Sequence, residues 1–438
     1  MEMQKLKDAA LYAVDKLLEE GADEAQSSAA EGRTEEFNVD AGEFSLIRSV
    51  FSSSIGLKAI KDKKKGTTAV NSLDKDDIDD AAKECVQAAI SGAEDDAVCI
   101  AEKETNMDFR DGVLEGNKEK FFDSIIKFID DVKKDYPQIM LEQVIANYSY
   151  GKHVFANSNG VLFSEEDGSY SISVMYSAHD GDKTTSFNYF DVETLDPGAD
   201  IMELGMTRTM FERAVAELDA KPFEGKFVGT AVLSPICLTE LISVITGSFC
   251  GDIALIEGTS PWKNLLGEKV ASDSFTLKVI PNDSRIICGE KITAEGYKSE
   301  NYDVIENGVL RSFCLTQYGA NRTGLNRSPS TSGSVEVKAG GESLDEIIAK
   351  IDRGILVCRF SGGEPASNGD FSGVAKNSFL IENGKISRPL TETMISGNFA
   401  AMLKQVEGIS RETLQDGGCV LPYAAFGGVT VSGGAQAE

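Results

Sequence analysis

Residues 368–398 of the chain read NGDFSGVAKNSFLIENGKISRPLTETMISGN. Runs of alternating apolar and polar residues flank the Asn383-Gly384 pair, and such alternation is typical of half-buried β-strands. Asn-Gly favours a type I′ hairpin turn, because both central residues of that turn need a positive φ. The same four letters, IENG, recur at 305–308 between two further strand-like runs. The stretch therefore predicts antiparallel β-hairpins in this part of the chain.

The strand-rich pattern extends over residues 225–438, which we expect to form a C-terminal β-rich domain. KPFEGKF at 221–227 is interpreted as the linker that precedes it. Apolar residues at helical spacing predict only three helices in this domain. These predicted helices lie in residues 233–249, 343–354 and 398–409.

The chain before the linker shows two segments, each with the order helix, strands, helix. In residues 1–115 the first helix ends at Gly21, and the second begins after Ser72 or Asp74 and ends before Gly92. In residues 116–222 a helix stopped by a proline precedes several strands. A last helix is predicted over residues 200–220. The two segments are candidates for one packed domain, and the fold class predicted for the whole chain is α+β.

Composition limits the function. The chain of 438 residues has 71 acidic and 43 basic residues and a net charge of -28, which argues against binding to nucleic-acid phosphates. No apolar run approaches the ~18 residues that a membrane helix needs. The first residues, MEMQKLKDAALYAVDKLLEE, lack the apolar core of a secretory signal. We therefore expect a cytoplasmic protein that binds neither nucleic acid nor membrane.

Motifs for several common chemistries are missing from the sequence. The eight cysteines form no CxxC pair, so they are predicted to be buried free thiols rather than a disulfide framework or zinc ribbon. The only two histidines, His153 and His179, lie in predicted strands far from other ligand types. No GxSxG nucleophile motif and no GK[ST] phosphate loop occurs.

The helix predicted within LSPICLTELISVITGSF, residues 233–249, raises a separate question. Cys237 and Glu240 are three residues apart, so a helix places them on one face. A metal site or a general base can begin with such a pair. The residues alone leave open whether this is an active-site helix, the remains of one, or ordinary core.

Four stretches together resemble the TldD/TldE (PmbA) family, whose members are described as modulators of DNA gyrase or as metalloprotease-related proteins. They are NGDFSGVAKNSFLIENGKISRPLTETMISGN, TRTMFERAVAELDA, SFCGDIAL and ENGVLRSFCLTQYGANRTG. The resemblance covers essentially the full length of the chain, and residues 368–398 are its most specific part.

The resemblance implies two types of chain that pair with each other. TldD-type chains carry a His-Glu-x-x-x-His zinc motif on the helix that opens the C-terminal domain, and a cysteine near the C-terminus completes the metal site. TldE-type chains lack these ligands. Residues 233–249 contain no histidine, and Cys237, Glu240 and Cys419 are a poor substitute for paired imidazoles. We therefore predict a TldE-like chain with no catalytic residue and no metal ligand.

By resemblance, the chain is a non-catalytic subunit that binds extended or unfolded peptides for a TldD-type zinc peptidase. It is expected to dimerise with that peptidase or with itself, and to hold no cofactor, with zinc only in the partner. Backbone groups beside strand edges are expected to hold the peptide. The residues predicted to contact it are Asn368, Gly369, Asp370, Phe371, Ser372 and Tyr318. The alternatives are an active metallopeptidase with atypical ligands, or an interaction protein acting on DNA gyrase or toxin–antitoxin systems.

Overall fold

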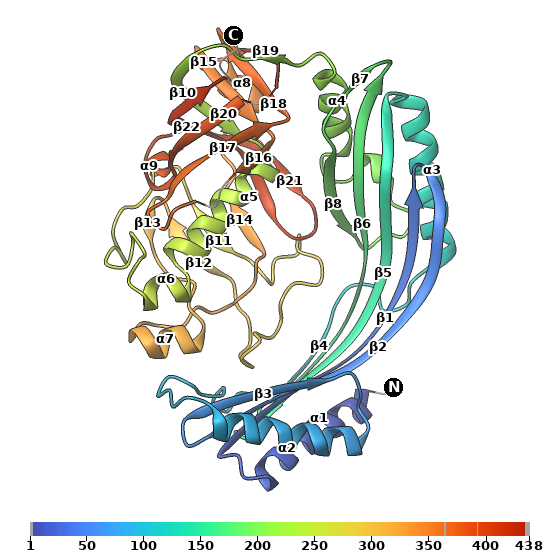
Figure 1. Cartoon of the computed structure of the whole chain (residues 1–438), viewed down its shortest axis with the longest axis vertical. Coiled ribbons are helices and arrows are strands. Elements are labelled where there is room, and N and C mark those ends of the chain that lie inside the picture. Colours follow the sequence, from blue (N-terminus) through green and yellow to red (C-terminus); the bar gives the residue numbers. More distant parts are fainter. Residues whose placement is uncertain (1–2, 363–364, 392, 434–438) are drawn as a thin grey trace.

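A computed structural model describes residues 3–362, 365–391 and 393–433. The N-terminal half forms an eight-stranded sheet and the C-terminal half a fourteen-stranded one. Figure 1 shows the long strands of the first sheet beside the C-terminal half, with two helices packed across their lower end. The predicted α+β class, with helix–sheet–helix units before a larger strand-rich domain, is confirmed.

The N-terminal sheet is built on two long antiparallel hairpins that lie side by side. Its strand order is β3-β2-β1-β5-β6-β4, and β7 and β8 also pair with β6. Both segments predicted before the linker thus contribute to one sheet. The strands are β1 (Glu24–Asp40), β2 (Glu43–Lys61), β3 (Lys64–Val70), β4 (Met107–Arg110), β5 (Ile139–Asn157), β6 (Leu162–Asp180), β7 (Lys183–Thr184) and β8 (Asn188–Thr194).

Two groups of helices pack on this sheet and form separate hydrophobic clusters. Ala29 and Phe37 of β1 are eight residues apart and so share one face, yet Ala29 belongs to the first cluster and Phe37 to the second. The helices of the first cluster are α1 (Met3–Glu19) and α2 (Lys75–Ser91). Those of the second are α3 (Lys118–Asp135), the 3-10 turn η1 (Ile201–Glu203) and α4 (Thr207–Glu217).

Local signals explain most of these helix ends. Asp74 and Gly92 flank α2 as predicted, and the Asn117 side chain accepts a hydrogen bond from the backbone N–H of Lys120 at the start of α3. The prediction of a single helix over residues 200–220 is wrong, because this stretch forms two separate elements. Gly205 takes a φ of 56° there and separates η1 from α4, because a left-handed residue ends a helical run.

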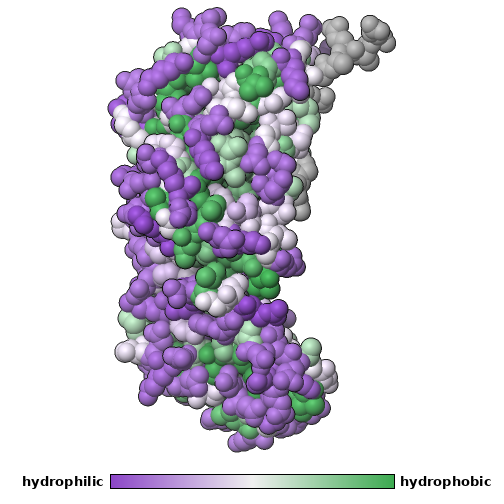
Figure 2. All heavy atoms as spheres, turned by 90° about the vertical axis from the view of Figure 1, so that its left-hand side faces the viewer, coloured by the Kyte–Doolittle hydropathy of each residue, from purple (hydrophilic) through white to green (hydrophobic). Residues whose placement is uncertain are grey.

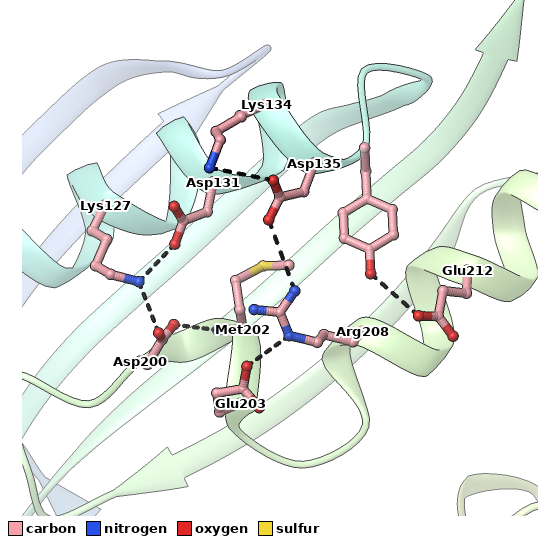
Figure 3. A network of polar contacts seen from close by, with 10 residues as sticks. Lys127, Asp131, Lys134, Asp135, Asp200, Met202, Glu203, Arg208 and Glu212 are labelled. Atoms are coloured by element: carbon pink, nitrogen blue, oxygen red, sulfur yellow. Dashed lines mark hydrogen bonds and ion pairs between the residues drawn. The ribbon is translucent and has the colours of Figure 1, made fainter.

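Surface ion pairs join α3 to η1 and α4 (Figure 3). Lys127 contacts Asp131 at 2.6 Å and Asp200 at 2.8 Å. The Arg208 guanidinium lies 2.7 Å from Glu203 and 3.9 Å from Asp135. Exposed pairs of this kind contribute little stability, so the contact rests mainly on the buried side chains beneath them.

The C-terminal sheet has many short strands in mixed orientation. Its main path is β13-β12-β11-β14-β22-β10-β15-β18-β19-β9, and β16, β17, β20 and β21 branch from it. The first residues of the predicted linker form β9. The strands are β9 (Lys221–Pro222), β10 (Lys226–Leu233), β11 (Leu277–Val279), β12 (Tyr302–Glu306), β13 (Val309–Leu310), β14 (Val335–Val337), β15 (Arg353–Val357), β16 (Arg359–Gly362), β17 (Asp370–Lys376), β18 (Ser378–Glu382), β19 (Lys385–Thr391), β20 (Thr393–Asn398), β21 (Val406–Gln415) and β22 (Val420–Ser432).

The two predicted Asn-Gly turns are present in this half. Asn383 and Gly384 have φ angles of 51° and 76° between β18 and β19, and Asn307 and Gly308 of the other IENG turn, between β12 and β13, have φ angles of 48° and 80°. The helices here are α5 (Pro235–Ser243), the π-helical η2 (Val244–Phe249), α6 (Asp252–Ile256), α7 (Gln317–Thr323), α8 (Leu344–Ile348) and α9 (Phe399–Leu403).

The two halves touch at several points. The Tyr318 hydroxyl on α7 donates to Asp95 at 2.8 Å, and Arg213 on α4 donates to the Tyr423 hydroxyl at 2.9 Å. Figure 2 views the face on the side of the C-terminal half, where polar side chains interrupt the apolar patches. In the part of the chain that the structure describes, no helix has the length and apolar character needed to cross a membrane.

Candidate functional site

A candidate site lies along the helix that continues from α5 into η2. Ser234 caps this helix by accepting a hydrogen bond from the Cys237 backbone N–H at 3.2 Å, and Pro235 occupies the first turn. Leu238, Leu241 and Ile245 point into the core and are fully buried. The helix ends in a π-helical turn, a feature often found at functional sites.

The other side of this helix forms one wall of a cavity of about 670 Å³, here called the α5 cavity. Its lining is rich in hydroxyl groups and small residues. The helix contributes Thr239, Ile242, Ser243, Thr246 and Gly247, and the opposite walls contribute Val279, Tyr302, Cys314, Thr316, Ser330, Thr331, Ser332, Gly333, Ser334, Val335, Asp416, Gly418 and Cys419. The size falls in the range of small-ligand sites.

Carboxylates around the α5 cavity hold its walls in place. Glu290 accepts hydrogen bonds from the Ser330 hydroxyl at 2.7 Å and from the Thr331 backbone N–H at 3.1 Å. Asp252 accepts a bond from the Thr316 backbone N–H at 3.0 Å. Glu290 and Asp252 are therefore engaged by the protein itself. The lining of the cavity is rich in serine and threonine residues, so a ligand would meet mainly hydroxyl groups.

The cysteine near the C-terminus lies in this cavity, held by a tight turn. The Asp416 carboxylate accepts bonds from the backbone N–H of Gly418 at 2.9 Å and of Cys419 at 2.8 Å, and from the Cys419 thiol at 3.3 Å. Burial raises the pKa of the Cys419 thiol, and the Asp416 charge raises it further. Zinc binds the thiolate, so both effects disfavour metal binding at Cys419.

The candidate ligands predicted from the sequence are not brought together. Cys237 and Glu240 line a small apolar pocket with Phe371 and Phe399, whereas Cys419 lies in the α5 cavity. Cys237 is 3% exposed, and burial raises the pKa of its thiol. No group of three or more His, Cys, Asp and Glu side chains suited to a metal ion occurs among the described residues. The residues present do not fit a zinc site.

Both histidines lie in the N-terminal sheet, away from the α5 cavity. His153 on β5 contacts the Ser28 hydroxyl at 2.7 Å, and burial lowers its pKa. His179 on β6 contacts the Ser177 hydroxyl at 2.8 Å. Both hydroxyl partners belong to the same sheet, and His179 also lies 4.0 Å from the Glu142 carboxylate. This is the pattern of strand side chains with structural contacts.

A second pair of thiols lies at the edge of the α5 cavity. The Cys314 backbone N–H donates to the Cys250 carbonyl at 2.9 Å. Burial raises the pKa of Cys250, whereas hydrogen bonds from Cys250 and Tyr302 lower that of Cys314. This contact fixes the end of η2 against the segment that leads into α7.

Residues 368–371 pack against α5 and η2 on the side that faces away from the α5 cavity. Gly369 has a φ of 90°, and a Cβ added to it would come within 2.8 Å of the Phe249 ring at the end of η2. The Phe371 ring stacks on Phe399 with centroids 4.3 Å apart. Asn368 and Asp370 are exposed, and the Asn368 amide donates to the Asp370 carboxylate at 2.8 Å. The Asn398 amide donates to the Asn368 carbonyl at 3.0 Å and to the Asp370 carboxylate at 2.9 Å, which closes a turn. The most family-specific segment therefore supports the helix from the side opposite the cavity.

The other residues predicted to contact peptide are also outside the lining. Ser372 is exposed on β17, where it pairs with Ser396 of β20. Tyr318 belongs to α7, which lies far below β17 in Figure 1. The structure does not bring Tyr318 and residues 368–372 together, and their contact with peptide stays a prediction. The cavity itself was missed, although the hydroxyl-rich run SPSTSGS at 328–334 signals it in the sequence.

The fold and the site thus define a class of α+β protein. In this class a hydroxyl-lined cavity lies beside a helix that ends in a π-helical turn. The chain belongs to the PmbA/TldD family: residues 225–433 match the PmbA/TldA metallopeptidase C-terminal domain, and residues 28–93 match domain 1.

Relatives support this assignment at modest identity. The chain is 25% identical to metalloprotease PmbA of Escherichia coli O157:H7 in an alignment of 298 residues that covers 64% of each chain. It is also 25% identical to a Methanocaldococcus jannaschii protein without an assigned function over 400 residues, 86% of this chain and 89% of that one.

Solved structures share the fold. TldE from Thermococcus kodakarensis superposes with a TM-score of 0.85 at 21% identity, covering 97% of this chain and 100% of that chain. A Bacteroides thetaiotaomicron protein described as a candidate modulator of DNA gyrase gives a TM-score of 0.86 at 23% identity, covering 98% of both chains.

Proposed function

We propose that the chain is a TldE-like, non-catalytic subunit that binds extended or unfolded peptide for a TldD-type zinc peptidase. The observation that carries the proposal is the chemistry of the α5 cavity. The helix that opens the C-terminal domain forms one wall of this cavity, and it presents Thr239, Ser243 and Thr246 there instead of histidines. Hydroxyl groups bind peptide N–H and C=O groups but do not hold zinc as imidazoles do.

The acid and thiol groups near the cavity support the same proposal. Asp416 accepts three bonds from its own turn, and the Cys419 thiol is held protonated by burial. A peptide would therefore bind mainly through neutral hydrogen-bonding groups, because Asp416, the one carboxylate in the described lining, already accepts the bonds of its own turn. In this proposal zinc belongs to a TldD-type partner subunit, and the chain forms a dimer either with that peptidase or with itself.

Peptide binding is tested with matched threonine variants. Thr239→Trp fills the α5 cavity. Thr67→Trp is the control, because Thr67 is also an exposed threonine but lies on β3. The probe is a fluorescein-labelled unfolded casein fragment, and the readout is fluorescence anisotropy. We expect binding at least about tenfold weaker for Thr239→Trp, equivalent to ~1.4 kcal/mol, and little change for Thr67→Trp. Equal effects of the two variants, or no binding by the unaltered chain, would contradict the proposal.

The subunit role is tested by proteolysis assays on the purified chain, alone and mixed with a TldD-type peptidase. We expect no cleavage of casein by the chain alone and faster cleavage by the mixture than by the peptidase alone. Zinc-dependent cleavage by this chain alone, with near-stoichiometric zinc that Cys419→Ala removes, would instead establish an active metallopeptidase with atypical ligands.

A further inference from the structure

One stretch of the N-terminal sheet lies between the two helix groups and is charged where its neighbours are apolar. Ala29 and Phe37 of β1 belong to the first and the second hydrophobic cluster and share one face of the strand. The residues between them on that face are Glu31, Arg33 and Glu35. Figure 1 shows α1 and α2 at the lower end of the strands and α3 farther up. Packing of helices on the sheet does not account for charged residues at this position.

A cavity of about 610 Å³, here called the β1 cavity, opens over this charged stretch. Its walls come from β1, β2, β5 and the loop that leads into α3. The volume lies in the range of small-ligand sites. The lining includes three acidic and three basic residues, which are Glu31, Glu35, Glu115, Arg33, Lys118 and Lys152. Because the charges balance over the whole lining, their positions decide which ligand the cavity can bind.

The part of the β1 cavity nearest Glu35 carries more positive than negative charge. Glu35 is 2% exposed, and it accepts hydrogen bonds from Arg33 Nε at 2.7 Å and from Lys118 Nζ at 2.7 Å. The side chains of Arg33 and Lys118 remain 52% and 47% exposed. A guanidinium has five N–H donors and an ammonium group has three, so both cations keep donors for a second acid. Two cations around one buried carboxylate therefore form a site for the carboxylate of a ligand.

The other charged residues of the lining leave this site available. Strand register places Lys152 of β5 directly opposite Glu31 of β1, and opposite charges at facing positions of a sheet attract each other. Glu115 is exposed on the loop before α3, where solvent screens its charge. An anion is therefore favoured beside Arg33 and Lys118, although the chain as a whole has a net charge of -28.

Tyrosine rings supply an apolar surface beside the two cations. Tyr148 and Tyr150 of β5 both line the cavity. The Tyr148 hydroxyl donates to the Val113 carbonyl at 2.8 Å, and the Tyr150 hydroxyl donates to the Glu166 carboxylate. A Cβ added to Gly116 would come within 2.5 Å of the Tyr148 ring, so the loop before α3 lies directly on that ring. Because both hydroxyl groups are engaged elsewhere, the tyrosines offer their rings to a ligand.

Phe51 of β2 extends this apolar surface on the other side of Arg33. Strand register places Arg33 between Phe51 of β2 and Tyr150 of β5. The Arg33 guanidinium lies 6.0 Å from the centre of the Phe51 ring, which is 74% exposed. A ligand ring can pack on these aromatic side chains while the ligand carboxylate binds the guanidinium between them.

We infer that the β1 cavity binds a small aromatic carboxylate, with the carboxylate on Arg33 and Lys118 and the ring against Tyr150 and Phe51. Such binding covers apolar ring surface and gives a second acid to the two cations that share Glu35. This site is separate from the α5 cavity and does not depend on the proposed function.

Isothermal titration calorimetry of the full, unaltered chain with three matched probes tests the class of ligand. 3-Phenylpropionate has a ring and a carboxylate, 3-phenylpropionamide has the ring without the charge, and propionate has the charge without the ring. We expect saturable binding of 3-phenylpropionate, and binding at least about tenfold weaker for the other two probes. Absence of 3-phenylpropionate binding, or equal binding of the amide or of propionate, would overturn the inference.

Matched lysine variants test whether the probe binds in the β1 cavity. Lys118→Gln removes one of the two cations. Lys120→Gln is the control, because Lys120 also lies in the first turn of α3 and its side chain is 53% exposed, but it pairs with Asp196. We expect the dissociation constant of 3-phenylpropionate to rise at least about fivefold for Lys118→Gln and to change less than about twofold for Lys120→Gln.

Arg33→Gln tests the second cation from a strand rather than a helix, and circular dichroism checks that each variant is folded. The dissociation constant should rise at least about fivefold in this variant as well. Equal effects of Lys118→Gln and Lys120→Gln would overturn the inference. Unchanged binding in both Lys118→Gln and Arg33→Gln would place the probe elsewhere and would also overturn it.

Discussion

The two long hairpins of the N-terminal half have the same antiparallel form but different surroundings. In β5–β6, strands β4 and β8 cover the outer edge, and aromatic side chains from α3, α4 and β8 pack over one face. In β1–β2, no other strand among the described residues pairs with the outer edge from residue 43 to 54, and its apolar side chains are exposed. Two hairpins of similar strand length can therefore differ in how much of their edge the rest of the chain covers, and we expect their contributions to the free energy of unfolding to differ as well. One hairpin is covered by other strands of the chain along its outer edge, and the other keeps exposed apolar side chains at its edge.

The largest contrast is expected between two phenylalanines. Phe211 of α4 is fully buried, and its ring contacts those of Phe128, Tyr136, Tyr176 and Phe190. Phe211→Ala should lower the free energy of unfolding by about 3–5 kcal/mol, because it removes a large buried side chain and leaves a cavity. Urea denaturation followed by circular dichroism measures the change.

Phe51→Ala is the matched substitution on the open hairpin. In dilute, monomeric protein it should change the free energy of unfolding by less than about 0.5 kcal/mol, as surface substitutions commonly do. A loss comparable with that of Phe211→Ala would show that the β2 edge is covered within the single chain.

Ionisable groups give the next largest contrast. Burial opposes ionisation of Glu35, on β1, but hydrogen bonds from Lys118, Ser49 and Arg33 outweigh it and lower its pKa to about 2. Glu35 therefore contributes stability above its unfolded pKa near 4.5, and this contribution is lost as the pH falls toward 2. Glu35→Gln should cost about 2 kcal/mol at neutral pH and weaken the decline of stability in acid. Thermal unfolding between pH 2 and 7 measures both effects.

Glu165 of β6 should behave in the opposite way. Burial, aided by the charge of Asp167, raises its pKa to about 7. A raised pKa favours folding below about pH 4.5, and this contribution declines as the pH rises to 7. Glu165→Gln should therefore flatten the pH dependence between those values. If the slope of the unfolding free energy against pH were unchanged in this variant, Glu165 would not contribute to the pH dependence of stability.

A small effect is also expected for the ion pairs on the surface of α3. Lys127→Ala removes the ion pairs with Asp131 and Asp200 seen in Figure 3. The loss should be below about 1 kcal/mol and smaller in high salt, since exposed pairs are screened. Chemical denaturation at two salt concentrations measures it, with Lys338→Ala as a control on an exposed lysine outside this network. A salt-independent loss of several kcal/mol would mean that ion pairs rather than aromatic packing hold α3 to α4.

Elements set by local chemistry were the most predictable from the sequence. Caps and stops placed the ends of α2 and α3, and Asn-Gly pairs placed two hairpin turns. The helix at 233–249 was also expected, and α5 and η2 occupy residues 235–249. These features depend on residues within a few positions of one another, so the sequence displays them directly.

The candidate site was less predictable because it depends on which side of a helix faces which neighbour. Cys237 and Glu240 share a face as their spacing predicts, but that face meets Phe371 and Phe399. Cys419 approaches the helix from its other side. Helical spacing specifies which residues share a face, but not what that face will contact.

The sequence by itself determined the helix and turn positions, the α+β class, the acidic surface and the family resemblance, because these follow from local patterns and composition. Tertiary structure alone decided that Thr239, Ser243 and Thr246 face a cavity, that residues 368–371 support the helix from behind, and that the β2 edge stays open. These outcomes depend on contacts between segments far apart in the chain, and packing of the whole molecule selects them.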